Sequence, residues 1–102
     1  LLPITLDAQG CTAADISLIR IGPASLVTVP GEPHPEVTAK LKAMMSGRFK
    51  FILGVANHEV GYFVALETWD PEGVQESLSA GKDNEPVLLD TVRRLLAAIG
   101  DP

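Results

Sequence analysis

Residues 25–56, "SLVTVPGEPHPEVTAKLKAMMSGRFKFILGVA", predict a strand, a helix and a second strand in direct succession. The run "SLVTV" at 25–29 is short, apolar and rich in β-branched residues, as in a buried strand. Pro35 suits the first position of a helix, and Gly47 is placed to follow its last turn. We therefore expect a helix over residues 35–46.

The run "FKFILGVAN" at 49–57 predicts the strand that follows this helix. A strand–helix–strand unit makes its two strands parallel, so both end at the same edge of the sheet. Ligands bind outside that edge in open α/β sheets. The segments that leave it are "PGEPH" at 30–34 and "NHEVGY" at 57–62. We expect Glu32 to converge there with the later cluster of Asn57, His58, Glu59 and Tyr62.

The remaining sequence completes an α/β fold with a mixed sheet. Residues 3–8 and 16–22 have strand character, and the turn residues between them predict an antiparallel pair. Residues 57–85 show no convincing period of either kind. A final helix is expected from residues 84–86 to Gly100. The class is thus α/β (α+β mixed sheet), in which antiparallel strands lead into a βαβ unit that a C-terminal helix closes.

Composition limits the domain count and the partners. The 102 residues suffice for a single domain, 1–102. Hydrophobic residues make up 46% and mean hydropathy is +0.22, which is high for a small monomer that buries only about 65% of its chain surface. We expect something outside this sequence to cover part of the apolar surface.

The net charge of −5 argues against nucleic acid and anionic membranes as partners. No apolar run is long enough for a transmembrane segment.

Glu32 has three possible roles at the end of its strand: metal ligand, general base or solvated turn residue. Pro-Gly is a common turn, and the residue after it can simply face water. However, Pro30, Gly31 and Pro33 limit the backbone around the carboxylate, as in a site that holds a ligand with little residual freedom.

The neighbouring polar residues also allow structural interpretations. His34 is placed to cap the helix that begins at Pro35 or to be simply exposed, and we favour these roles over metal binding. His58 follows a strand end, where a histidine can be a ligand or a partner of one. Asn57 is expected to support the backbone, and Tyr62 to pack with its hydroxyl hydrogen-bonded. Glu32, His34 and His58 together match no standard zinc spacing.

Three segments together resemble a known enzyme family. They are "RIGPASLVTVPGE" at 20–32, "GVANHEVGY" at 54–62 and "VQESLSAG" at 74–81, ahead of the closing helix. Their order and strand contexts resemble the later part of the neutral/alkaline (non-lysosomal) ceramidase family. In that family a strand ends in a Pro-Gly-Glu turn, and a second strand leads into an Asn-containing segment with Gly-Tyr. The resemblance covers roughly residues 15–99.

The resemblance implies a zinc-dependent amidase that cleaves the N-acyl bond of ceramide. It implies that Glu32 is the carboxylate ligand of the zinc and Tyr62 its phenolate ligand, with Asn57 and His58 as possible neighbours of the ligands. The family's two histidine ligands lie much earlier in its sequence, and nothing here matches them. The chain also departs from the family at Gln75, where an aromatic residue usually precedes the glutamate, and this puts ceramide itself in doubt as substrate.

Two functions follow. The first is the C-terminal portion of a larger ceramidase-like hydrolase, which contributes part of a zinc site and has no turnover by itself. Its partner is then the upstream part of the parent chain or a homo-oligomer partner, and its substrate a lipid amide. The abrupt start at Leu1 and the high apolar fraction favour this function. The alternative is a stand-alone α/β binding or assembly domain without catalysis.

Overall fold

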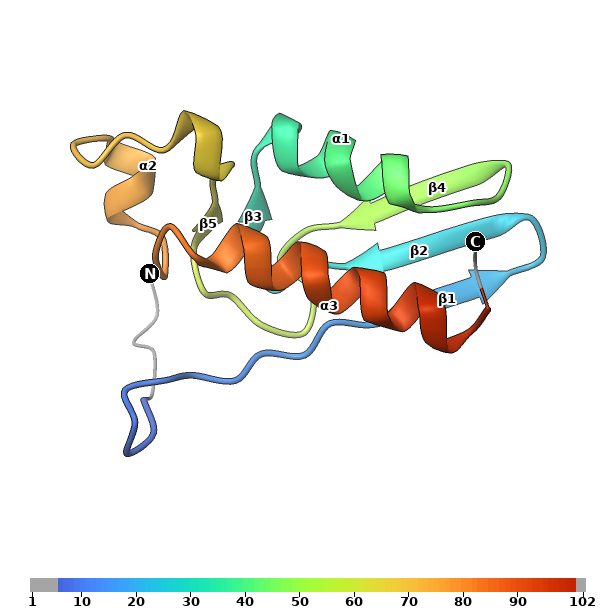
Figure 1. The fold of residues 1–102 in the computed structure, drawn as a ribbon, viewed down its shortest axis with the longest axis horizontal. Coiled ribbons are helices and arrows are strands. Elements are labelled where there is room, and N and C mark those ends of the chain that lie inside the picture. Colours follow the sequence, from blue (N-terminus) through green and yellow to red (C-terminus); the bar gives the residue numbers. More distant parts are fainter. Residues whose placement is uncertain (1–5, 101–102) are drawn as a thin grey trace.

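Three strands and two long helices form the centre of the fold in residues 6–100, which the computed structural model describes (Figure 1). The main sheet has the order β1-β2-β4, with β1–β2 antiparallel and β2–β4 parallel. These elements confirm the α/β class, the strand–helix–strand unit and the closing helix that the sequence predicts. The strands are β1 (Leu18–Ile21), β2 (Ala24–Thr28) and β4 (Phe49–Leu53), and the helices are α1 (Pro35–Met44) and α3 (Asn84–Ala98).

Short elements fill the parts of the chain that the sequence left unassigned. They are β3 (Glu32–Pro33), β5 (Tyr62–Phe63), the 3₁₀ turn η1 (Leu66–Thr68) and the single-turn helix α2 (Val74–Ser77). β3 and β5 pair with each other as a second, two-stranded sheet. Residues 57–85 therefore contain elements of only two to four residues before α3 begins, which are too short to show a period in the sequence.

One expected pairing is not found within residues 6–100. The strand at 16–22 was expected to pair with residues 3–8, but β1 pairs with β2 through the turn at Gly22 and Pro23. Residues 6–8 form no strand, and residues 3–5 lie outside the described part. The reason is local, because the Asp7 carboxylate accepts backbone N–H bonds from Gln9 and Cys11, each at 2.9 Å. This turn takes up backbone donors that a ladder would need.

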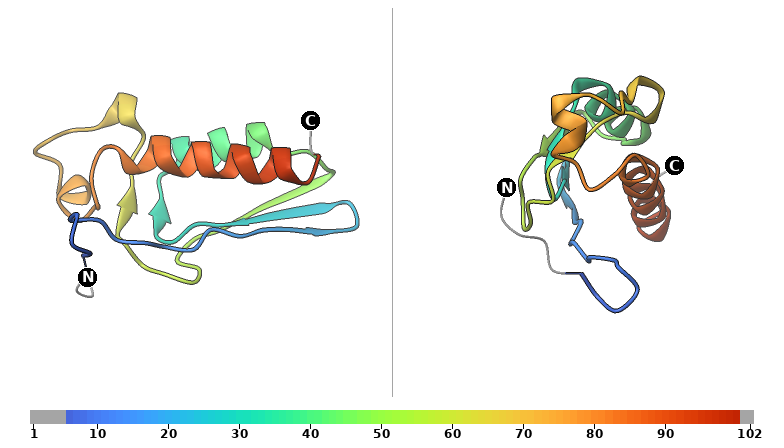
Figure 2. Two further views of the ribbon diagram at one scale, coloured as in Figure 1. Left: turned by 60° about the horizontal axis from the view of Figure 1, so that its bottom comes forward. Right: turned by 90° about the vertical axis from the view of Figure 1, so that its left-hand side faces the viewer.

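Both long helices cover the same face of the sheet (Figure 2). An apolar stripe on each helix supplies the core, because Val37 and Leu41 of α1 and Leu88 and Val92 of α3 are buried. From the sheet, Val27 is buried against them. On the outer side of α3, Arg94 Nη2 and Asp90 Oδ2 form an i,i+4 ion pair at 2.7 Å.

The opposite face of the sheet carries large apolar side chains that nothing in the described chain covers. We call it the apolar sheet face, and its members are 41–65% exposed: Ile19, Ile21, Phe49, Phe51 and Leu53. The register places Ile19 and Phe51 beside Leu26, on the side of β2 opposite to buried Val27. The face supports the expectation that apolar surface of this chain needs a cover. No helix within residues 6–100 is long and apolar enough to span a membrane.

A buried carboxylate joins α1, η1 and α3. Glu85, in the first turn of α3, is 3% exposed and accepts a hydrogen bond from Lys40 Nζ at 2.8 Å. Its second oxygen accepts the backbone N–H of Leu66 at 3.2 Å. Lys40 also donates to Glu67 Oε1 at 2.7 Å. A buried charge is tolerated only when it is paired in this way.

Removal of the lysine should therefore destabilise the fold. We expect Lys40→Met to lower the free energy of unfolding by about 1–3 kcal/mol, because the buried Glu85 carboxylate then keeps only its hydrogen bond from the Leu66 amide. The effect stays within this range because the Lys40 side chain is partly exposed, and water already weakens its ion pair with Glu85. Urea denaturation measures the effect. The control is Lys42→Met on the same helix, which changes an exposed lysine and should stay within about 0.5 kcal/mol of the wild type.

The same network sets the direction of the pH dependence. The hydrogen bonds to Glu67 and then to Glu85 raise the pKa of Lys40 above 10.5, and the bond from Lys40 lowers the pKa of Glu67 below 4.5. The contribution of Lys40 to the free energy of unfolding is thus complete below pH 10.5, and it is lost as pH rises through the folded pKa of Lys40. The contribution of Glu67 is complete above pH 4.5, and it is lost as pH falls through the folded pKa of Glu67. Equal wild-type and Lys40→Met stability near neutral pH would contradict this assignment.

Candidate metal site

Glu32 and Tyr62 are direct partners in the parallel pairing of β3 with β5. The Glu32 N–H donates to the carbonyl oxygen of Gly61 at 3.0 Å, and the His34 N–H donates to that of Phe63 at 2.9 Å. Paired residues of neighbouring strands lie about 4.8 Å apart and project to the same face. The expected convergence of Glu32 and Tyr62 is therefore confirmed, while their role as zinc ligands stays a prediction.

Two glycines allow this pairing. A Cβ on Gly31 would overlap the carbonyl oxygen of Gly61 and would lie 2.9 Å from Cε2 of Phe63. Gly61 has φ +92°, and a Cβ there would overlap the carbonyl oxygen of Leu78. Pro33 fits the same ladder because the donors on β3 are its neighbours Glu32 and His34, so the N–H that proline lacks is not needed.

The two faces of the ladder have different environments. Phe63 is 4% exposed and belongs to the core cluster. Since successive side chains of a strand point to opposite faces, Tyr62 projects away from the side that Phe63 fills. Tyr62 is half-buried and Glu32 is exposed, so the pair is open to a ligand from outside the core.

Residues 54–61 connect β4 to this ladder along a constrained path. Val55 and Asn57 adopt left-handed backbone conformations, with φ of 51° and 71°. Such a φ is a real outlier for a β-branched residue. The path is held because the Val55 N–H donates to the carbonyl of Gly31 at 2.8 Å and the Val60 N–H to that of Pro30 at 2.8 Å. The loop is thus tied to the turn that carries Glu32.

The other residues expected near the site are placed less centrally. The Asn57 amide lies 3.5 Å from Thr28 Oγ1, which fits its expected support of the strand end. His58 is exposed. Glu59 accepts the Gly61 N–H at 2.7 Å and so supports the ladder. The roles of Asn57 and His58 beside a metal stay predictions.

The cap proposed for His34 is wrong. His34 occupies the N-cap position of α1, but its side chain makes no capping hydrogen bond. Its ring instead meets the Tyr62 ring edge-on, with centroids 5.9 Å apart and planes at 70°. Its Nε2 is buried and has no hydrogen-bond partner among residues 6–100. The i,i+2 spacing of Glu32 and His34 on a strand was the sequence signal for this placement.

The donor set tests how far these residues fit a zinc ion. Glu32 offers a carboxylate and Tyr62 a phenol from adjacent strands. The His34 ring, whose Nε2 has no partner among residues 6–100, contacts the Tyr62 ring edge-on. Within residues 6–100, no group of three or more His, Cys, Asp or Glu side chains is placed to hold a metal. Glu32, His34 and His58 thus do not form a site together. Glu32 and Tyr62 offer two possible donors, and their binding of zinc stays a prediction.

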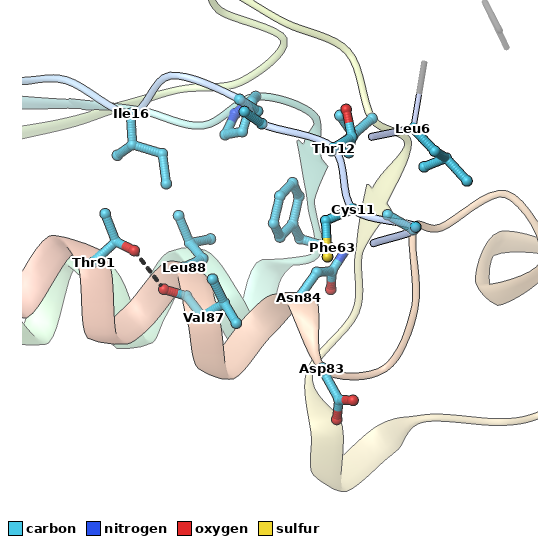
Figure 3. Close-up of a pocket in the computed structure, with 16 residues that line it drawn as sticks. Leu6, Cys11, Thr12, Ile16, Phe63, Asp83, Asn84, Val87, Leu88 and Thr91 are labelled. Atoms are coloured by element: carbon cyan, nitrogen blue, oxygen red, sulfur yellow. Dashed lines mark hydrogen bonds between the residues drawn. The ribbon is translucent and has the colours of Figure 1, made fainter. Parts of the chain in front are cut away.

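A cavity of about 740 Å³ lies elsewhere, between the N-terminal segment and α3 (Figure 3). Ile16 approaches it from one side and Leu88 from the other, while Phe63 closes it from the ladder. Neither Glu32 nor Tyr62 lines it. The buried ladder separates this hollow from the candidate metal site, so the cavity adds nothing to the chemistry of that site.

Comparison of the chain with protein-family models, with curated proteins and with solved structures gives no match. The case for the site therefore depends on its own geometry and on the sequence resemblance.

The close approach of Gly31 and Gly61 predicts a steep cost for one added methyl group. Gly31→Ala should force β3 away from β5 and lower the free energy of unfolding by about 2–4 kcal/mol. The control is Gly10→Ala, where the added Cβ meets nothing within 4 Å although φ is +76°, so only about 1 kcal/mol of backbone strain is expected. Thermal and urea unfolding compare the two, and equal losses would argue against the ladder.

Proposed function

We propose that this chain is the C-terminal portion of a zinc-dependent amide hydrolase related to the neutral/alkaline ceramidases, in which Glu32 and Tyr62 are two of the zinc ligands. The observation that carries the proposal is the direct pairing of Glu32 with Tyr62 in the β3–β5 ladder. These are the two residues that the family resemblance assigns to the metal, although 30 positions separate them.

The chain's residues have distinct tasks in this proposal. Glu32 contributes an anionic oxygen from a turn that Pro30 and Gly31 restrict. Tyr62 contributes a phenolate, a form that the charge of the metal stabilises. A bound zinc ion supplies Lewis-acid polarisation of an amide carbonyl and activation of water. The loop at 54–61 holds both ligands in place through its bonds to the Glu32 turn.

The rest of the hydrolase supplies what these residues do not. A catalytic zinc usually has three protein ligands of suitable type, so the upstream part of the parent chain or a homo-oligomer partner contributes further ligands. The substrate is a lipid amide. The 102 residues alone bind zinc weakly and do not hydrolyse amides.

Zinc content tests this proposal directly. The longest polypeptide that contains these residues should carry about one zinc per chain. Glu32→Gln and Tyr62→Phe should each lower its zinc affinity by at least about 100-fold, more than changes around a ligand usually cost. Elemental analysis after dialysis against a competing chelator measures this. The control is Glu36→Gln, which changes an exposed carboxylate in the first turn of α1. No zinc under metal-replete conditions would end the proposal.

The apolar sheet face supports a second candidate function, assembly of two copies without catalysis. Its five side chains are each about half exposed and together present on the order of 500 Å². A stable interface buries about 800 Å² on each partner. The five side chains supply more than half of this area, and the surface around them would supply the rest. A twofold axis between two such faces and along the strands would lay the Phe49 edge of one copy over the Ile21 edge of the other.

Sedimentation separates the two functions. If the face is a homodimer interface, the 102-residue chain should sediment as a dimer at micromolar concentration and Phe51→Lys as a monomer, because the lysine would be buried without a partner. The control is Val74→Lys, which changes a residue of α2 that is 77% exposed and leaves the sheet unchanged. A wild-type monomer would exclude this second candidate.

A further inference from the structure

We infer that the His34 imidazole belongs to the same site as Glu32 and Tyr62, with Nε2 as the nitrogen ligand that this chain contributes to the metal. The inference deepens the proposed function and rests on it. It is separate from the family resemblance, which assigns only Glu32 and Tyr62 within this sequence.

The strand geometry places the three residues on one face. Glu32 of β3 and His34, the residue that follows β3, both donate their backbone N–H to the β5 segment, so their side chains leave on the same side. Tyr62 pairs with Glu32 and projects to that side as well. The contact between the rings of His34 and Tyr62, with centroids 5.9 Å apart, is the direct evidence that this shared face brings them together.

The His34 ring lacks a partner that its environment requires. Nε2 is shielded from solvent and makes no hydrogen bond within the described chain. A buried polar atom in this state is rare, because it has lost its water without replacement. An imidazole nitrogen satisfies this need by a hydrogen bond or by binding a cation. The carboxylate and phenol on the same face favour the cation.

The backbone holds this histidine in one place. Prolines stand on both sides of it, and His34 has the extended conformation, φ −67° and ψ 157°, that a following proline favours. Its N–H donates a hydrogen bond to the carbonyl oxygen of Phe63. Its own carbonyl oxygen accepts the N–H of Val37 at 3.0 Å, at the start of α1. A ligand fixed in this way loses little freedom when a metal binds.

The donor types select the class of metal. One imidazole nitrogen with carboxylate and phenol oxygens suits Zn²⁺ or Co²⁺, whereas Mg²⁺ and Ca²⁺ prefer oxygen alone. With His34 as a donor, fewer ligands would have to come from the rest of the hydrolase. The chain itself would then bind zinc in a way that depends on His34.

The composition permits a residue-specific test, because the sequence has one tyrosine and two histidines. Zinc chloride is titrated into the 102-residue chain while tyrosinate difference absorbance reports Tyr62 and ¹⁵N NMR of the imidazoles reports His34 and His58. We expect the Nε2 resonance of His34 to shift over the same zinc range as the Tyr62 signal, and to shift more than that of His58. His34→Gln should weaken zinc binding at least tenfold, and Glu36→Gln, at an exposed residue of α1, should leave it unchanged.

The outcomes distinguish the two proposals. If the Tyr62 signal responds to zinc but the His34 resonance does not, the role of His34 is overturned and the zinc site of Glu32 and Tyr62 stands. If neither responds, His34 as a ligand is overturned, and the zinc content of the longer polypeptide then tests the proposed function separately. The wild-type NMR measurement needs no variant, so a misfolded His34→Gln protein would not prevent the test.

Discussion

Gly31 and Gly61 bring two backbone segments closer than any side chain would allow, and the rest of the site follows from that approach. It lets β3 and β5 exchange backbone hydrogen bonds over only two residues each. So short a ladder has little stability of its own. Its position is set by Phe63, which is buried in the core on one face. Because adjacent side chains alternate, burial of Phe63 directs Tyr62 outward toward Glu32 and His34.

The segment after β5 is held by electrostatics as well as by the burial of Val64 and Ala65. The amide of Leu66 donates to Glu85, which Lys40 neutralises. A carboxylate in the first turn of α3 also interacts favourably with the positive end of the helix. The ion pair thus connects both long helices to the chain just beyond Tyr62. The core fixes β5 from one side and this network fixes the chain that leaves it, so the ordering of Tyr62 depends on both.

The sequence was sufficient for the elements with a clear period and clear ends. The helix that begins at Pro35 and the strands on either side of it were predictable, and their parallel pairing gave the convergence of Glu32 with Tyr62. The ladder itself was not predictable, because two-residue strands have no period and Gly31 and Gly61 fit each other only in three dimensions. The orientation of His34 was missed for a related reason. Its position beside Pro35 indicated a cap, whereas its environment is set by Tyr62, which is distant in the sequence.

The apolar sheet face adjoins the candidate metal site along the chain, and this affects how the two candidate functions relate. Leu53, at one end of that face, leads directly into the loop at 54–61 that carries Tyr62. Val55 in this loop is 53% exposed and has a strained backbone. A layer that covered Leu53 would also approach Val55, and burial of Val55 would offset part of the strain. Both functions therefore require a cover at the same place. They differ in whether that cover also brings metal ligands.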